Sequence, residues 1–322
     1  MVEIFGKKAT RIGYGEGLVE LGEKNERVVA LSADVCGSTA TNFFRDRFPK
    51  RYFSTGIAEQ NMMTIAAGLA LAGFIPYAAS YSIFASGRAW DQIRNMICYC
   101  PCNVKIVGTH SGVTVGPDGA THQALEEIAL MRVIPRMTVI VPADALEAKK
   151  ATIAVGKLAG PVYLRVGREP SPIFTKEDSP FQIGKAQILR EGNDAAIVAC
   201  GLMVYESLLA GEILAEKGIQ ARVINLHTIK PIDKTTLITA AEECGAVVTA
   251  EEHQASGGLG GAVAEVLSEN FPVPIKRIGV ADRFGESGES LELLKHLNLT
   301  SLDIVLAVEQ IIKFKKKLAK RS

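Results

Sequence analysis

Two histidines and an aspartate lie in one glycine-rich segment, residues 108–123, which is the part of the sequence best suited to proton transfer. His110 and His122 carry the side chain that exchanges protons near neutral pH, and Asp118 lies between them. The segment follows a strand-like run, so we expect it to leave the carboxyl end of a strand, where open parallel sheets bind ligands. A lone histidine is more often structural, but two with an aspartate in such a loop favour a functional site.

Glu59 is a second candidate, because it stands where a predicted strand ends at Gly56 and a helix begins. A carboxylate in the first turn can simply complement the helix dipole. Glu59 also opens a stretch without charged residues that ends only at Arg88, so we expect it to be buried. A buried carboxyl group with no cation beside it can hold a proton and then both donate and accept hydrogen bonds. The residues alone leave both interpretations open.

Two further motifs predict packing rather than chemistry. Cys98, Cys100 and Cys102 lack a second Cys or His pair at zinc spacing, so we expect them to pack as small apolar thiols at a helix end. The glycine-rich run 257–261 lies between a predicted strand and a predicted helix. That position suits an anion-binding turn, but a tight turn that brings helix and sheet close together is favoured.

Strand-like and helix-like segments alternate along almost the whole chain and predict an α/β protein. Around residues 167–181 the alternation stops, and three prolines fall within eleven residues, which indicates a linker. We therefore predict two domains, 1–168 and 185–322, joined by residues 169–184, each a mainly parallel sheet with helices on both faces. The expected strands are 28–34, 51–56, 75–80, 104–110, 138–142 and 162–166 in the first domain, and 195–200, 221–226, 246–250 and 275–278 in the second.

Composition and charge exclude several classes of protein. The chain has 322 residues, 48% of them hydrophobic, and its 36 Lys and Arg against 35 Asp and Glu leave a net charge of +1. This balance offers no electrostatic surface for nucleic acid or for an anionic membrane.

The uncharged stretch 60–87 is interrupted by Pro76 and diluted by Ser, Thr and Asn, so it predicts buried core elements rather than a membrane span. No export signal is visible, and six cysteines in a chain this long fit the cytoplasm.

At the Glu59 and His110–His122 motifs the sequence resembles the transketolase family of thiamine-diphosphate enzymes. It is similar to the family's C-terminal half, a pyrimidine-binding domain followed by the C-terminal domain, over nearly the whole chain. Each matching fragment is short, but their order and spacing together are specific. The fragments are 32–34, 56–61, 80–84, 116–123, 160–165 and 284–288.

The resemblance implies a role for each candidate residue. Glu59 would contact the aminopyrimidine ring of thiamine diphosphate and promote proton removal from its thiazolium ring, and Tyr81 and Phe84 would stack on the pyrimidine. Gly87 stands where fused transketolases often have a further aromatic side chain. His122 would act on the substrate as a catalytic residue. The implied substrate-binding residues are His110, Asp118, His122, Ser38, Asp34 and Arg168, with Arg165 as the alternative to Arg168 for a sugar phosphate.

The family binds the cofactor's diphosphate and Mg²⁺ on another domain, with a Gly-Asp-Gly motif and a downstream Asn that this sequence lacks. The resemblance therefore implies no metal ligands here and one subunit of a split transketolase. An N-terminal partner subunit would complete the site in an α2β2 assembly, with sugar phosphates of the pentose phosphate pathway as substrates.

Three other functions remain as alternatives. The β subunit of a 2-oxo-acid dehydrogenase E1, which decarboxylates a pyruvate-type acid, resembles the same two domains. The two histidines with Asp118 suit polyhydroxylated sugar phosphates better. The synthase of deoxyxylulose phosphate resembles the chain too, but it is usually fused. A non-catalytic scaffolding subunit would not need Glu59, Phe84 and the two histidines together.

Overall fold

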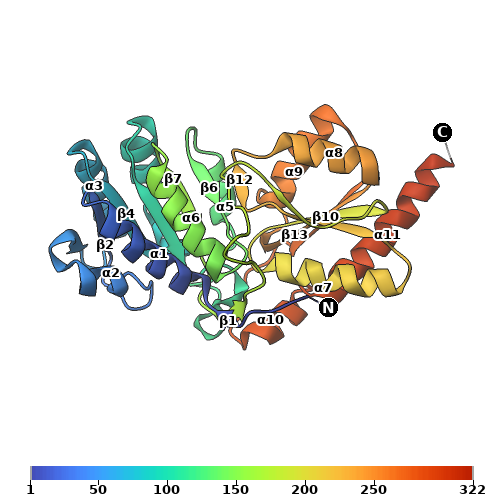
Figure 1. Ribbon diagram of the computed structural model, residues 1–322, viewed down its shortest axis with the longest axis horizontal. Helices are drawn as coiled ribbons and strands as arrows, with labels where there is room; N and C mark the ends of the chain where they lie inside the picture. Colours follow the sequence, from blue (N-terminus) through green and yellow to red (C-terminus); the bar gives the residue numbers. More distant parts are fainter. Residues whose placement is uncertain (1, 321–322) are drawn as a thin grey trace.

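The computed structural model describes residues 2–320, and within them two parallel sheets stand side by side along the long axis of the molecule (Figure 1). The first sheet has seven strands in the order β12-β6-β7-β5-β4-β2-β3, and only β12, which pairs with β6, runs antiparallel. Its strands are β2 (Val28–Ser32), β3 (Tyr52–Ser54), β4 (Ile75–Tyr81), β5 (Lys105–Thr109), β6 (Thr138–Ile140), β7 (Val162–Arg165) and β12 (Thr228–Lys230).

Both faces of this sheet are covered, because successive side chains of a strand point to opposite faces. Val28 and Ala30 of β2 pack in a cluster with α1 (Thr10–Lys24) and α6 (Ala145–Lys157). Val29 and Leu31 pack in another cluster on the opposite face, which contains α3, η3 and α5. The remaining helical segments are α2 (Asn42–Arg47), η1 (Pro49–Arg51), α3 (Glu59–Leu71), η2 (Ile83–Arg88), α4 (Trp90–Gln92), η3 (Ile93–Tyr99), η4 (Val113–Asp118) and α5 (Glu127–Arg132).

The second sheet has five strands in the order β14-β13-β10-β11-β9, and only β9 is antiparallel to its neighbour. Helices α7 and α11 cover one face and α8 and α9 the other. Its strands are β9 (Gln187–Arg190), β10 (Ala195–Ala199), β11 (Ala221–Asn225), β13 (Val247–Gln254) and β14 (Ile275–Val280). Its helices are α7 (Met203–Glu216), α8 (Lys234–Cys244), α9 (Leu259–Asn270), α10 (Ser290–His296) and α11 (Ser301–Ala319).

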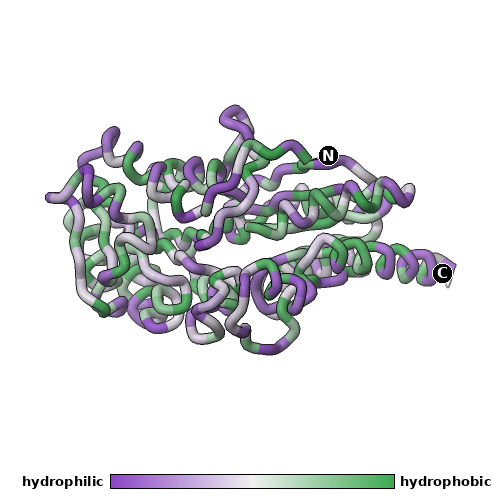
Figure 2. The backbone as a smooth tube through the Cα atoms, turned by 90° about the horizontal axis from the view of Figure 1, so that it is seen from below, coloured by the Kyte–Doolittle hydropathy of each residue, from purple (hydrophilic) through white to green (hydrophobic). Residues whose placement is uncertain are grey.

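The α/β class with helices on both faces of mainly parallel sheets is confirmed. Residues 59–81 form a buried helix, a turn and a buried strand, as the pattern predicts, and no helix in the described part of the chain could cross a membrane. The last helix buries Ile304, Val308 and Ile311, and its end extends beyond the body of the molecule (Figure 2). Edge strands β9 and β12 and the short pair β1 (Lys7–Lys8) and β8 (Ser171–Pro172) were not expected.

The two sheets are joined by more than the proline-rich segment. Strand β12 comes from the second half of the chain but pairs with β6 of the first sheet. One apolar cluster also runs continuously from α3 and α5 to α8 and α9. The division into domains at 1–168 and 185–322 stays a prediction, because β12 crosses it.

The glycine-rich run 257–261 forms a tight turn that brings helix and sheet close together, which is the interpretation that the sequence favoured. The carboxylate of Glu251 accepts hydrogen bonds from the backbone N–H groups of Leu259 (2.7 Å) and Gly260 (2.8 Å) at the start of α9. A Cβ atom on Gly258 would lie 2.0 Å from Glu251 Oε2, so only glycine fits there. The anion at this helix N-terminus is thus a side chain of the protein itself.

Cys98 and Cys102 pack in the core at the end of η3, as expected, whereas Cys100 is exposed. Within residues 2–320 no three His, Cys, Asp or Glu side chains come together as a metal ion would require.

Candidate functional site

Glu59 is the first residue of α3, and only 2% of its surface is exposed. Ser80, at the end of β4, donates a hydrogen bond from Oγ to Glu59 Oε1 (3.0 Å). Arg88 donates from Nη1 to the other carboxylate oxygen, Oε2 (2.8 Å). The expected burial is confirmed, and because Arg88 pairs with the carboxylate, Glu59 is not a buried carboxyl group without a cation. The two residues are the ends of the uncharged stretch, and this was the signal in the sequence that could have identified the pair.

Four aromatic side chains gather beside Glu59, from the carboxyl ends of two neighbouring strands. Strands β4 and β5 pair in parallel with Tyr81 opposite Thr109, so the segments that follow them start at the same edge. The Tyr81 ring lies 4.1 Å from that of His110, and the Phe84 ring lies 5.3 Å from that of His122, centre to centre. Tyr81 and Phe84 are 6.2 Å apart. The fold thus brings together four side chains that are up to 41 residues apart in the sequence.

His110 is neutral at ordinary pH, because burial and the nearby charges of Arg11 and Arg168 lower its pKa to about 4. Its ring Nδ1 lies 3.0 Å from Thr109 Oγ1, and only 4% of the residue is exposed. His122 is half-buried, and its Nδ1 lies 3.0 Å from Thr121 Oγ1. A neutral imidazole both donates and accepts a hydrogen bond, so the His110 ring suits hydroxyl and carbonyl groups.

Arg168 lies at the outer end of this group. Its Nη1 donates to the backbone oxygen of Val115 (2.8 Å) and to Asp118 Oδ1 (3.2 Å). Arg11, in α1, donates to the backbone oxygens of Arg168 (3.2 Å) and Ser38 (2.8 Å). Burial and the charge of Arg168 lower the pKa of Arg11. The structure therefore joins Ser38, Asp118 and Arg168 through Arg11, a residue that the sequence analysis missed because no motif surrounds it.

Asp34 follows β2, the strand next to β4, and so lies at the same sheet edge. It is exposed and has a left-handed backbone conformation (φ 61°), and no contact within residues 2–320 joins it to the other candidates.

Arg165 makes its contacts outside this group of residues. Its Nε donates to Glu127 Oε1 (2.5 Å), its Nη2 donates to the backbone oxygen of Glu252 (2.7 Å), and 6% of its side chain is exposed. It ties the first sheet to β13 of the second, whereas Arg168 is partly open to solvent at 32%.

The candidate cofactor residues suit an aminopyrimidine. The planar guanidinium of Arg88 lies 4.5 Å from the centre of the Phe84 ring while it binds Glu59. A flat nitrogen donor stacked on Phe84 and bonded to a buried carboxylate is the arrangement that an aminopyrimidine would require.

Comparisons with known proteins identify the family of this chain. Residues 6–172 match the family model "Transketolase, pyrimidine binding domain", and residues 184–304 match "Transketolase, C-terminal domain". A Methanocaldococcus jannaschii protein, provisionally named as a transketolase C-terminal section, is 48% identical over 97% of this chain and 99% of its own length. The 6-deoxy-6-sulfo-D-fructose transketolase subunit SqwH of Clostridium sp. (strain MSTE9) is 43% identical over 92% of both chains.

Among solved structures, one described as a split gene transketolase, an inactive β4 tetramer, superposes with a TM-score of 0.90. It is 48% identical, and the match covers 95% of this chain and 99% of that one. The chain therefore belongs to the transketolase family of thiamine-diphosphate enzymes, as the C-terminal subunit of a split transketolase. Enzymes of this kind transfer ketol groups.

Proposed function

We propose that this chain supplies the pyrimidine-binding and substrate-binding half of an active site that moves a two-carbon ketol unit from a ketose phosphate to an aldose phosphate. The observation that carries the proposal is the placement of the buried Glu59 carboxylate beside Tyr81 and Phe84, with His110 and His122 packed against those rings. This combination serves a proton-sharing cofactor on one side and a hydroxylated substrate on the other.

In this proposal Glu59 binds the aminopyrimidine nitrogen of thiamine diphosphate and exchanges a proton with it, while Tyr81 and Phe84 hold the ring. The cofactor, when bound, supplies the electron sink for breaking and forming the carbon–carbon bond. Ser80 orients the Glu59 carboxylate through its 3.0 Å hydrogen bond. Arg88 must release Glu59 Oε2 for the ring to bind in this way.

The substrate-binding roles fall to His110, His122, Asp118, Ser38, Arg168 and Asp34. His110 is neutral, so it accepts or donates a hydrogen bond without adding charge. Arg168 supports phosphate binding better than Arg165, because it is partly exposed and its planar fork of donors matches a phosphate. Arg11 adds positive charge beside it.

A separate N-terminal subunit would hold the diphosphate and Mg²⁺, and two copies of each chain would form an α2β2 enzyme. The names "C-terminal section" and "split gene transketolase" of two relatives support a divided enzyme. Six free thiols fit a reducing cytoplasm. Xylulose 5-phosphate, from the pentose phosphate pathway, is the first donor to test. Because one relative is named for 6-deoxy-6-sulfo-D-fructose, a specialised ketose is the second donor to test.

The test is co-expression with candidate partners that carry a Gly-Asp-Gly motif and a downstream Asn. Ketol transfer from xylulose 5-phosphate to ribose 5-phosphate is then assayed with thiamine diphosphate and Mg²⁺, for each chain alone and for the mixture. Transfer in the mixture alone supports the proposal. Decarboxylation of a 2-oxo acid without ketol transfer would instead assign the chain to an E1 β subunit.

A further inference from the structure

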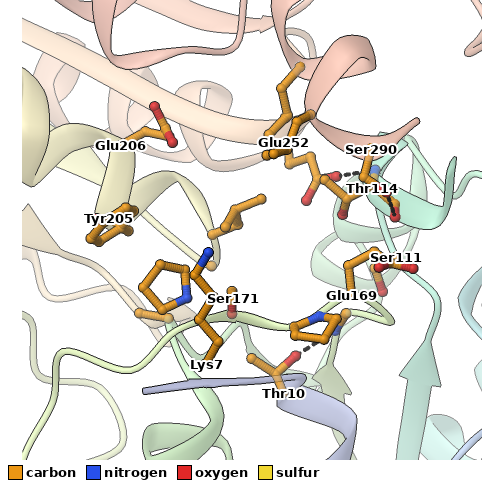
Figure 3. A pocket seen from close by; sticks show the side chains of 18 of the residues that line it. Lys7, Thr10, Ser111, Thr114, Glu169, Ser171, Tyr205, Glu206, Glu252 and Ser290 are labelled. Carbon is orange, nitrogen blue, oxygen red and sulfur yellow. Dashed lines mark hydrogen bonds between the residues drawn. The ribbon is translucent and has the colours of Figure 1, made fainter. Parts of the chain in front are cut away.

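A cavity of about 530 Å³ lies between the two sheets (Figure 3), and its lining includes Thr10, Ser111 and Glu169, which are chain neighbours of Arg11, His110 and Arg168. Its walls come from the segments after β5 and β7, from the start of α7, from β13 and from α10. None of the nine residues proposed to contact cofactor or substrate lines it. Its volume falls within the range of roughly 300–1,000 Å³ that is usual for small-molecule sites.

Glu252 of β13 is the central polar group of the cavity wall. The residue is 4% exposed, and its carboxylate lies on the wall with Oε1 accepting a 2.6 Å hydrogen bond from the Thr114 backbone N–H (Figure 3). A carboxylate accepts about four hydrogen bonds, so capacity for further donors remains. Burial raises the pKa of this carboxyl group although the charge of the nearby Arg165 acts in the opposite direction, and a bound cation would further offset the cost of its charge.

The other charges around the cavity are also mostly negative. Glu206 lies on the wall with its Oε2 bonded to the Ser301 backbone N–H (2.7 Å), and burial raises its pKa as well. Glu289 stands at the exposed mouth, and Glu169 is 3.4 Å from Arg168. Arg165 is paired with Glu127, so the lining cation without a carboxylate in contact is Lys7, whose side chain extends into the cavity from β1 (Figure 3).

The remaining surface is partly apolar, since the hydroxyl side chains of Thr10, Ser111, Thr114, Ser171 and Ser290 also line the cavity. Val141, Pro142, Leu202 and Leu294 form parts of the wall, together with the ring of Tyr205. An enclosed, partly apolar surface with a buried carboxylate at one point favours a ligand with an apolar body and a single positive group.

We propose that this cavity binds a small organic amine, with its ammonium group on Glu252 and its apolar body against the Leu202 and Leu294 wall. Lys7 places a second positive group in the same cavity, and its charge would oppose binding of the ligand's ammonium group. The proposal does not depend on the ketol-transfer activity, since the site is complete within this chain.

The experiment compares three probes that share a phenethyl group and differ in the polar group at its end, on the purified full-length chain by isothermal titration calorimetry. Phenethylamine carries the ammonium group, 3-phenylpropanol is neutral and 3-phenylpropionate is anionic. We expect saturable binding of phenethylamine and at least tenfold weaker binding of the other two, because a charge-assisted hydrogen bond is worth about 1.5–3 kcal/mol. Equal binding of the three, or no phenethylamine binding up to millimolar concentrations, would overturn the proposal.

Two variants locate the site. E252Q keeps the acceptor for Thr114 but removes the charge, and we expect it to weaken phenethylamine binding about tenfold. E251Q is the matched control, because Glu251 is the neighbouring buried glutamate on the opposite side of β13 and bonds α9. Unchanged affinity in folded E252Q, or an equal loss in E251Q, contradicts the assignment.

A third variant still tests the proposal if E252Q does not fold. Lys7 lies on an exposed two-residue strand, so K7M should leave the fold intact. Without the competing ammonium group, phenethylamine should bind about threefold tighter or more. Weaker binding to K7M would show that Lys7 belongs to an anion site instead and would refute the amine assignment.

Discussion

Arg88 binds the carboxylate of Glu59 at 2.8 Å while its guanidinium lies over the Phe84 ring at 4.5 Å. One side chain thereby occupies both groups expected to hold the cofactor's pyrimidine. The pair also gives Glu59, which is 3% exposed, a counter-charge in the absence of a ligand, while Arg88 itself is 45% exposed and free to move outward. We therefore expect Arg88 to stabilise the cofactor-free subunit and to compete with the cofactor for Glu59 and Phe84.

Replacing Arg88 with Met tests this competition. We expect thiamine diphosphate to bind the reconstituted complex more tightly, while the cofactor-free chain loses about 1 kcal/mol of stability because Glu59 loses its partner. Calorimetric titration and urea unfolding measure the two effects. Arg94→Met, on the exposed side of η3, is the control. Weaker cofactor binding in Arg88→Met would mean that Arg88 helps to hold the cofactor.

Glu59→Gln should reduce turnover of the reconstituted complex at least about 100-fold, because an amide cannot exchange the proton. The amide oxygen can still accept the hydrogen bond from Ser80, so the circular dichroism spectrum should be unchanged. Glu23→Gln, at the surface of the same domain, serves as the control. Near-normal rates in Glu59→Gln would remove Glu59 from the mechanism.

Arg168→Ala should raise KM for a phosphorylated donor about tenfold with a smaller change in kcat, since a charge-assisted contact to the phosphate is lost. Steady-state kinetics with the phosphorylated donor and its unphosphorylated analogue measure the effect. The loss should vanish with the unphosphorylated donor. An equal loss with both donors would show that Arg168 acts through Asp118 rather than on the phosphate.

Arg165→Met should lower the free energy of unfolding by about 3–5 kcal/mol, because Glu127 is left buried without its partner. Glu127→Gln should also destabilise the chain, and the double variant should be more stable than the sum of the two losses predicts. Urea unfolding of the four proteins completes the cycle. Strictly additive losses would show that the two side chains do not interact.

His227→Phe should change how stability depends on pH. His227 is fully buried against the Phe181 ring at 4.4 Å, and burial lowers its pKa to about 4. Because the unfolded chain takes up the proton near pH 6.5, neutral His227 contributes fully above that pH and its contribution is lost as the pH falls towards 4.

The stability advantage of the wild type over His227→Phe should therefore shrink by about 3 kcal/mol between pH 7 and pH 4. Unfolding free energies at several pH values measure this gap. Phe181→Leu, which changes the same contact without removing a titrating group, should give a curve parallel to the wild type. A constant gap for His227→Phe would show that the histidine is not held neutral.

Local patterns in the sequence were enough to predict the inner strands and the helix at Glu59. Each inner strand is a short apolar run, and its burial on both faces follows from the helices on either side. Edge strands β9 and β12 were missed because they are short and half-polar, and only their pairing partners stabilise them. The partner of β12 lies about 90 residues away in the chain, beyond the reach of any local pattern.

The sequence by itself determined the residue types of the site, since Glu59, the aromatic pair and the two histidines each stand in a recognisable motif. Only the tertiary structure decided what each of them touches. The parallel pairing of β4 with β5 sets Tyr81 beside His110, and the turn of η2 brings Arg88 back onto Glu59. Such contacts depend on strand register and crossovers, which bring residues far apart in the chain to one sheet edge. Apart from the uncharged stretch that ends at Glu59 and Arg88, no spacing along the sequence indicates them.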